Sequence, residues 1–169
     1  MSADFSSKHT KVCIVDDDEE TGFFLSNLIT KMGFEAEYFT ESIKCLQTIE
    51  QQPFDLIITD YYMPKMNGLD LIKDLKEKNI NIPVVLITER GNKELIKEAL
   101  KEGVVDFLEK PILIEDVHRS VNRGLEKVSL NRKFNELRQT YRNLIDSCQL
   151  FMVDLSENEM KQNLLTILI

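Results

Sequence analysis

Four short stretches of the sequence carry polar residues that could act together on one phosphoryl group. They are the acidic run at residues 16–18, the single carboxylate Asp60, the hydroxyl of Thr88 and the basic Lys110. Carboxylates bind a divalent cation or accept a phosphoryl group, while a hydroxyl and a lysine donate hydrogen bonds to phosphoryl oxygens. Each stretch ends or follows an apolar run, so the fold decides whether the four meet.

The elements between these residues predict a fold that brings them together. Continuous apolar runs at residues 12–15, 56–59 and 84–87 are typical of parallel strands buried on both faces. Two further strands are expected at 36–39 and 105–108, with helices between successive strands. The predicted fold class is therefore α/β, with a five-stranded parallel sheet between two layers of helices. Because the carboxyl ends of parallel strands share one edge, the four sites are expected to converge there.

Apolar spacing predicts which side of each helix is buried. The expected buried residues are Phe23, Phe24, Leu28 and Met32, then Ile43, Leu46, Gln47 and Ile49, then Leu69, Ile72 and Leu75, then Leu95, Ile96, Ala99 and Leu100, and last Ile114, Val117, Val121 and Leu125. Asp18 and Asn67 stand where helices begin, and Gly33 and Gly103 stand where helices end. For Asp18 a capping role is therefore preferred over metal binding.

Composition excludes several functions. The chain has 169 residues, a net charge of -8 and no dominant basic cluster, so no nucleic-acid binding by this chain is expected. Three widely spaced cysteines without a CxxC pair indicate reduced thiols. No apolar run is long enough to cross a membrane, and the first ten residues lack a signal peptide. A cytoplasmic location is expected.

The pattern changes after Val128. Apolar residues then recur at alternating spacings of four and three, as in a heptad seam: Leu130, Phe134, Leu137, Tyr141, Leu144, Cys148 and Phe151. The seam either packs back on the preceding domain or pairs with another chain. A homodimer is favoured, because the five βα units already look complete and would leave the stripe unburied. Residues 128–169 are expected to be a helical extension, a coiled-coil linker toward a missing or truncated output domain.

The motifs together resemble the receiver domain of two-component response regulators. The resemblance rests on VCIVDDDE, DLIITDYYMPKMNG, VVLIT and DFLEKP, in that order. It covers about residues 11–126, inside an expected domain of residues 8–127. It implies a flavodoxin-like, doubly wound (β/α)5 fold and a phosphorylation-dependent signalling switch of a two-component phosphorelay. It also implies no enzyme activity beyond self-phosphorylation and autodephosphorylation.

The resemblance implies a role for each matching residue. Asp60 matches the phosphoacceptor, which takes its phosphoryl group from a histidine kinase or a phosphotransfer protein. Asp17, Asp60 and the backbone carbonyl of Tyr62 match the ligands of Mg²⁺ or Mn²⁺, with Asp16 acting indirectly. Thr88 and Lys110 match the groups that contact the phosphoryl oxygens.

The same resemblance implies how the signal leaves the site. Thr88 and Phe107 match a switch pair in which the aromatic ring turns inward after the threonine moves. Pro111 matches the position after a cis peptide bond with Lys110. The change is expected to reach the surface of the fourth helix, fifth strand and fifth helix. That surface, or the C-terminal helix, would form the homodimer.

Three features depart from the commonest receiver pattern. Glu89 follows Thr88 where receivers usually carry a small residue, and it could repel a phosphoryl group or narrow access to it. Tyr62 and Arg90 are bulky and flank the same opening, so we hypothesise that they lengthen the phosphoryl lifetime by excluding water. Phe107 replaces the more frequent tyrosine, which removes the hydroxyl and keeps the ring.

Two other functions are compatible with parts of the pattern. A pseudo-receiver would fold the same way and serve as an interaction module without phosphorylation. The run at residues 16–18, followed by Thr88 and Lys110, is also similar to haloacid-dehalogenase-like phosphohydrolases, where the first aspartate is the nucleophile. That second alternative leaves Asp60 unexplained and lacks an evident acidic motif after the lysine.

Overall fold

The computed structural model describes residues 10–89 and 93–167. The chain forms two compact units, the first ending at Val128 and the second beginning at Ser129. Within the described residues, no helix combines the length and apolarity that a membrane crossing requires.

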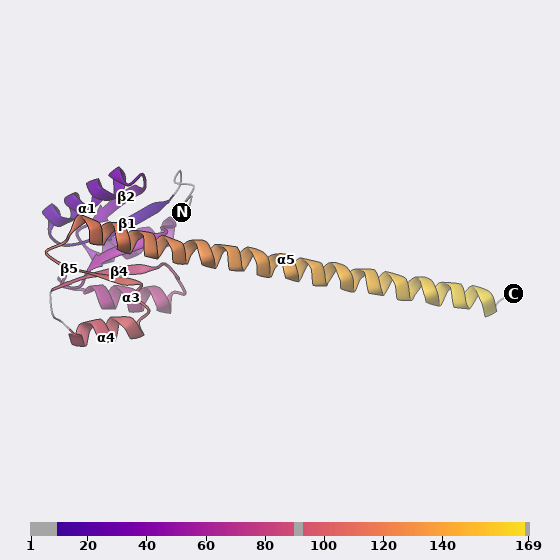
Figure 1. The fold of residues 1–169 in the computed structure, drawn as a ribbon. Helices are drawn as coiled ribbons and strands as arrows, with labels where there is room; N and C mark the ends of the chain where they lie inside the picture. Colours follow the sequence, from indigo (N-terminus) through magenta and orange to yellow (C-terminus); the bar gives the residue numbers. More distant parts are fainter. Residues whose placement is uncertain (1–9, 90–92, 168–169) are drawn as a thin grey trace. The chain divides into compact units, whose positions relative to one another are not determined.

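The first unit is built on a five-stranded parallel sheet (Figure 1). Its strands are β1 (Lys11–Val15), β2 (Glu35–Phe39), β3 (Leu56–Asp60), β4 (Val84–Glu89) and β5 (Asp106–Lys110). They lie in the order β2-β1-β3-β4-β5, and every neighbouring pair is parallel. The predicted α/β class and the doubly wound five-stranded sheet are confirmed.

Helices cover both faces of this sheet. They are α1 (Glu19–Lys31), α2 (Ser42–Gln51), α3 (Gly68–Glu77), α4 (Lys93–Lys101) and α5 (Ile114–Ile167). One apolar cluster joins α1 and the start of α5 to one face, through Leu25, Ile29 and Val121 among others. A second cluster joins α2, α3 and α4 to the other face. Alternate strand residues such as Ile57 and Ile58 enter opposite clusters, as the two-residue period of a strand requires.

Local signals set the helix ends as the sequence predicts. Asp18 caps α1, where its carboxylate accepts hydrogen bonds from the Glu20 amide at 3.1 Å and the Thr21 hydroxyl at 2.7 Å. Asn67 caps α3 in a capping box with Asp70. Gly33 and Gly103 have φ values of +90° and +71°, a conformation that is strained for residues with a side chain.

The predicted buried faces are wrong at several positions. Phe23 is 66% and Phe24 is 41% exposed, and α1 instead buries Gly22, Leu25 and Ile29. The reason is a close approach: a Cβ on Gly22 would lie 2.6 Å from the Tyr38 ring of β2, so this side of α1 must face the sheet. Further residues expected to be buried are exposed: Ile43, Gln47, Leu100 and Ile114.

The fifth strand lies one residue later than predicted at its start and extends further at its end. It pairs with β4 from Val85 opposite Asp106 to Glu89 opposite Lys110. Lys110 is therefore the last residue of the strand, and the ladder fixes its position.

In the second unit, the described chain is the remainder of α5. Five seam residues are 56–67% exposed: Leu130, Phe134, Leu137, Tyr141 and Leu144. Cys148 is also exposed. The side chain of Phe151 lies outside the described residues.

Candidate functional site

The sheet order places the predicted site residues at one edge. β1 and β3 are neighbours although β2 lies between them in sequence, so the order of strands reverses there. In open α/β sheets, ligands bind at the carboxyl ends of strands beside such a reversal. Asp16 follows β1, Asp60 ends β3, Thr88 is the penultimate residue of β4 and Lys110 ends β5.

Lys110 joins the two buried carboxylates. Its Nζ lies 2.9 Å from Oδ1 of Asp60 and 3.9 Å from Oδ2 of Asp16. The side chains of Asp60 and Asp16 are 4% and 0% exposed, whereas that of Lys110 is 31% exposed. Three groups at the carboxyl ends of three strands therefore lie together, with the two carboxylates buried and the lysine partly exposed.

Asp16 is the least satisfied member of the site. Its Oδ1 accepts a hydrogen bond from the Asp18 amide at 3.0 Å, but its buried Oδ2 has no hydrogen-bond partner. Burial raises the pKa of Asp16 to about 6, and the charges of Asp60 and Asp17 add to the rise. The hydrogen bond from the Asp18 amide and the charge of Lys110 oppose it only in part. A cation near Oδ2 would relieve this arrangement.

Asp60 and Lys110 shift each other's pKa in opposite directions. Burial raises the pKa of Asp60, although the hydrogen bond and charge of Lys110 and a hydrogen bond from the Tyr62 backbone oppose it. Burial alone would lower the pKa of Lys110, but its bond to Asp60 and the charge of Asp16 outweigh burial, so its pKa is raised. The lysine therefore stays protonated as the counter-ion of both carboxylates.

Thr88 is fully buried beside this pair. Its hydroxyl donates a long hydrogen bond of 3.4 Å to the Glu89 carbonyl. Asp60 pairs with Ile87 in the ladder, so Thr88 lies one residue further along the neighbouring strand. A hydroxyl held by such a weak bond can turn toward a new acceptor at small cost.

The loop after Asp60 folds back on the strand that carries it. The Gly68 amide donates to the Tyr61 carbonyl at 3.0 Å. A Cβ on Gly68 would overlap the Asp60 carbonyl oxygen and lie 2.9 Å from the Leu86 side chain. Only glycine fits here, so residue 68 fixes the backbone of the predicted phosphoacceptor.

The carboxylates are of the type that binds a metal ion, but they are not spaced as ligands of one. Among residues 10–89 and 93–167, no three carboxylate, histidine or cysteine side chains are grouped closely enough to hold one. Asp17 is exposed, yet its charge acts on both Asp16 and Asp60. The buried Oδ2 of Asp16, which has no hydrogen-bond partner, and the raised pKa values of Asp16 and Asp60 are what a cation would compensate. The donor set therefore fits Mg²⁺ or Mn²⁺.

The remaining predicted residues surround this centre. Tyr62 is 54% exposed and contacts Tyr61 edge to face, with ring centroids 4.5 Å apart. Glu89 is exposed at the end of β4, and its charge helps to raise the pKa of Lys110. Phe107 is half-buried against the cluster under α2, α3 and α4. The Lys110–Pro111 bond is cis. Arg90 lies outside the described residues.

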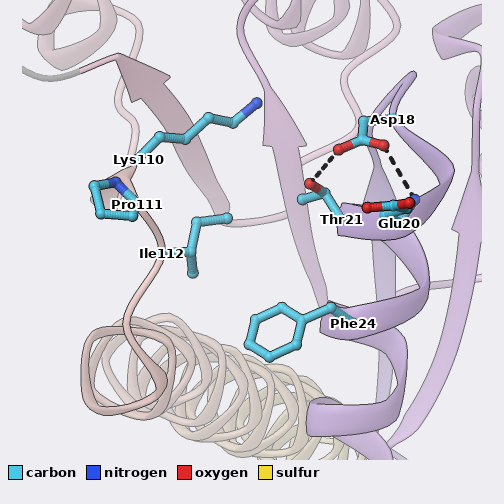
Figure 2. A pocket seen from close by; sticks show the side chains of 7 residues that line it. All are labelled: Asp18, Glu20, Thr21, Phe24, Lys110, Pro111 and Ile112. Carbon is cyan, nitrogen blue, oxygen red and sulfur yellow. Dashed lines mark hydrogen bonds between the residues drawn. The ribbon is translucent and has the colours of Figure 1, made fainter.

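A cavity of about 410 Å³ adjoins Lys110 (Figure 2). It lies between the start of α1 and the segment after β5, and its lining consists of Asp18, Glu20, Thr21, Phe24, Lys110, Pro111 and Ile112. Thr21, Phe24 and Ile112 were not predicted from the sequence to lie beside the site. A signal was present, because Phe23, Phe24 and Leu25 are consecutive and a helix cannot turn all three toward one sheet.

Comparison with known proteins gives the same family from sequence and from structure. Residues 12–122 match the response regulator receiver domain. The chain is 29% identical over 143 residues to the response regulator protein TodT of Pseudomonas putida, which covers 82% of the chain and 63% of TodT. It is 34% identical over 113 residues to the transcriptional regulatory protein FixJ of Rhizobium meliloti, covering 64% of the chain and 55% of FixJ.

Solved structures agree with these matches. The crystal structure of FixJ-N superimposes with a TM-score of 0.66 at 32% identity, covering 70% of the chain and 95% of FixJ-N. A response regulator receiver domain protein from Clostridium thermocellum gives a TM-score of 0.67 at 25% identity, covering 72% and 98% of the two chains. The chain thus spans nearly the whole of isolated receiver domains but under two thirds of the curated relatives TodT and FixJ.

Proposed function

The chain belongs to the response regulator receiver domain family of two-component systems, and from that membership we propose that Asp60 is its phosphoacceptor. The observation that carries the proposal is the contact of the Lys110 ammonium with Asp60, 2.9 Å away, inside a buried acidic site that contains Asp16. A histidine kinase or phosphotransfer protein in the cytoplasm would supply the phosphoryl group. Apart from phosphorylation and dephosphorylation of itself, the chain would catalyse no reaction.

Each residue has a definite part in the transfer. An Asp60 carboxylate oxygen attacks the phosphorus atom, and the bond from phosphorus to the donor breaks with its electron pair leaving on the donor. Lys110 moves its hydrogen bond from Asp60 to a phosphoryl oxygen, which keeps the added negative charge paired. The Thr88 hydroxyl turns from the Glu89 carbonyl to a second phosphoryl oxygen.

Mg²⁺ or Mn²⁺ would be held by Asp17, Asp60 and the Tyr62 carbonyl, with Asp16 acting indirectly. When bound, the ion supplies charge neutralisation between the carboxylates and the phosphoryl oxygens.

Phosphorylation adds about -1.5 to -2 charge at Asp60. Movement of Thr88 would free space into which the half-buried Phe107 ring turns, and β5 carries that change to the surface of α4, β5 and α5. The domain of residues 8–127 would act as a bistable switch, and the helical extension of residues 128–169 would link it to an output domain. A homodimer would form through the extension or through the surface of α4, β5 and α5.

Phosphoryl uptake tests this function. We expect incubation with acetyl phosphate and Mg²⁺ to add one phosphoryl group, mapped to Asp60 by mass spectrometry, and Asp60→Asn to abolish it. Asp18→Asn is the matched control, since it removes a neighbouring carboxylate that caps a helix and should leave uptake intact. No uptake by the wild type would support the pseudo-receiver instead. Uptake lost in Asp16→Asn but kept in Asp60→Asn would indicate the phosphohydrolase chemistry.

The lifetime of the phosphorylated state is a separate proposal. Tyr62 is 54% exposed at the edge of the site, where its ring can limit the approach of water to Asp60. We propose the same role for Glu89, through its charge, and for Arg90, which lies outside the described residues, through the size of its side chain. We expect Tyr62→Asn and Arg90→Ala to shorten the half-life of the phosphorylated chain severalfold, as measured by phosphate release. An unchanged half-life in both variants would refute the shielding role.

A further inference from the structure

The second unit carries an apolar surface that the described chain leaves open. The described side chains of the heptad seam are Leu130, Phe134, Leu137, Tyr141, Leu144 and Cys148, which follow one another at spacings of four and three. The first five side chains are 56–67% exposed, and Cys148 is exposed as well. An uncovered stripe of this length on one helix indicates an interface.

We propose that the seam pairs with a second copy of the chain as a parallel, in-register coiled coil that like charges keep weak. The proposal rests on the homodimer of the proposed function and selects the helix as its surface. The heptad pattern gives the geometry: Leu130, Leu137 and Leu144 occupy three successive d positions, the preference of parallel coiled coils. Phe134, Tyr141 and Cys148 occupy the a positions between them.

The buried area is sufficient for such a pair but not for a tight one. Aromatic side chains bury about 150–250 Å² each, and each copy supplies Phe134 and Tyr141 together with three leucines. More than half of each of these side chains is exposed before pairing. The pair would bury on the order of 1,000 Å² in total, at the lower end of what stable interfaces bury.

The residues that flank the seam weaken the pair further. Lys133 is at position g and Arg138 is at position e of the next heptad, and both are exposed. In a parallel, in-register coiled coil, g faces the e position five residues on in the other chain. Each Lys133 therefore faces an Arg138 across the interface, twice per dimer. Such a dimer strengthens as salt screens the repulsion.

Charge reversal tests the register. In sedimentation equilibrium of the full chain, we expect Arg138→Glu to lower the dimer dissociation constant about tenfold, because two repulsive pairs become attractive. We also expect added salt to strengthen the wild-type dimer and to weaken the Arg138→Glu dimer. Arg142→Glu is the matched control, with the same charge change at position b, away from the partner. Equal effects of the two variants, or no dimer in any of them, would overturn the proposal.

Cross-linking tests the orientation. In a parallel pair Cys148 lies opposite its own copy, whereas in an antiparallel pair an a position faces a d position. We expect a short bismaleimide to join two wild-type chains at Cys148 and to join none in Cys148→Ser. A dimer that does not cross-link would contradict the parallel arrangement. Both experiments can be repeated on Asp60→Asn, so failure of phosphoryl uptake and failure of seam pairing are distinguishable.

Discussion

At the scale of single residues, the negative charge of Asp16 destabilises the folded state. The folded chain holds this carboxyl away from water with one oxygen that accepts no hydrogen bond, and its pKa rises from 3.8 to about 6. Between pH 4 and 6 the folded state therefore binds a proton that the unfolded state has released. The contribution of Asp16 to the free energy of unfolding is fully present below pH 4 and is lost as the pH rises through 6. The loss amounts to at most about 3 kcal/mol.

We expect Asp16→Asn to have a free energy of unfolding about 1–3 kcal/mol higher than the wild type at pH 8, because asparagine replaces the buried charge with a neutral group of the same shape. At pH 4 the two proteins should have similar stability, since Asp16 is then protonated. Urea unfolding at both pH values measures this. A variant that is no more stable at pH 8 would show that the ionised carboxylate is compensated in the free protein.

The sequence predicted the positions of the candidate site residues at the sheet edge better than their electrostatic states. Asp60, Thr88 and Lys110 were placed because each stands at the end of a β-rich run, and parallel pairing brings such ends to one edge. The full burial of Asp16, next to the exposed Asp17, could not be predicted. The packing around β1 decides which of two adjacent carboxylates turns inward. That direction cannot be read from their order in the sequence.

At the scale of elements, the loop between β3 and α3 determines where Asp60 lies. We expect Gly68→Ala to destabilise the chain by about 1–3 kcal/mol and to slow phosphoryl uptake, because the added methyl group displaces the Asp60 carbonyl. Urea unfolding and acetyl phosphate uptake measure the two effects. Gly103→Ala is the control. Its positive φ is strained for alanine and should lower stability, but nothing lies within 4 Å of the added Cβ, so uptake should stay unchanged. Normal uptake by Gly68→Ala would show that the loop tolerates displacement.

The elements themselves were predicted well, and their orientations less so. Strand runs buried on both faces and helix caps are local signals, and they gave the sheet and the helix ends. The inward side of α1 depends on the contact of Gly22 with Tyr38, residues that are distant in sequence. Apolar spacing alone counts Phe23 and Phe24 as core, although three consecutive large residues cannot all face the sheet. Phe24 instead lines the surface cavity in Figure 2.

At the scale of the whole molecule, the first unit contains its own core. Every residue of both apolar clusters lies between Val12 and Leu125. We therefore expect a chain ending at Val128 to fold and to take up phosphate at Asp60, with a stability within about 1 kcal/mol of the full chain at low concentration. A chain ending at Asp116 loses Val117, Val121 and Leu125 and should not fold. Urea unfolding followed by circular dichroism compares the three, and an unfolded chain ending at Val128 would contradict this independence.

The three thiols differ in a way that is useful for experiments on this chain. Cys13 and Cys45 are buried with their sulfur atoms 3.2 Å apart, and burial raises the pKa of Cys13 well above its ordinary value. A reagent in solution cannot reach the two enclosed thiols, so a fluorescent or spin-label reagent should modify the exposed Cys148 alone in the native protein. Because Cys148 belongs to the seam, such a reagent should modify it more slowly when the helices associate, and the labelling rate would report association while phosphate is added at Asp60.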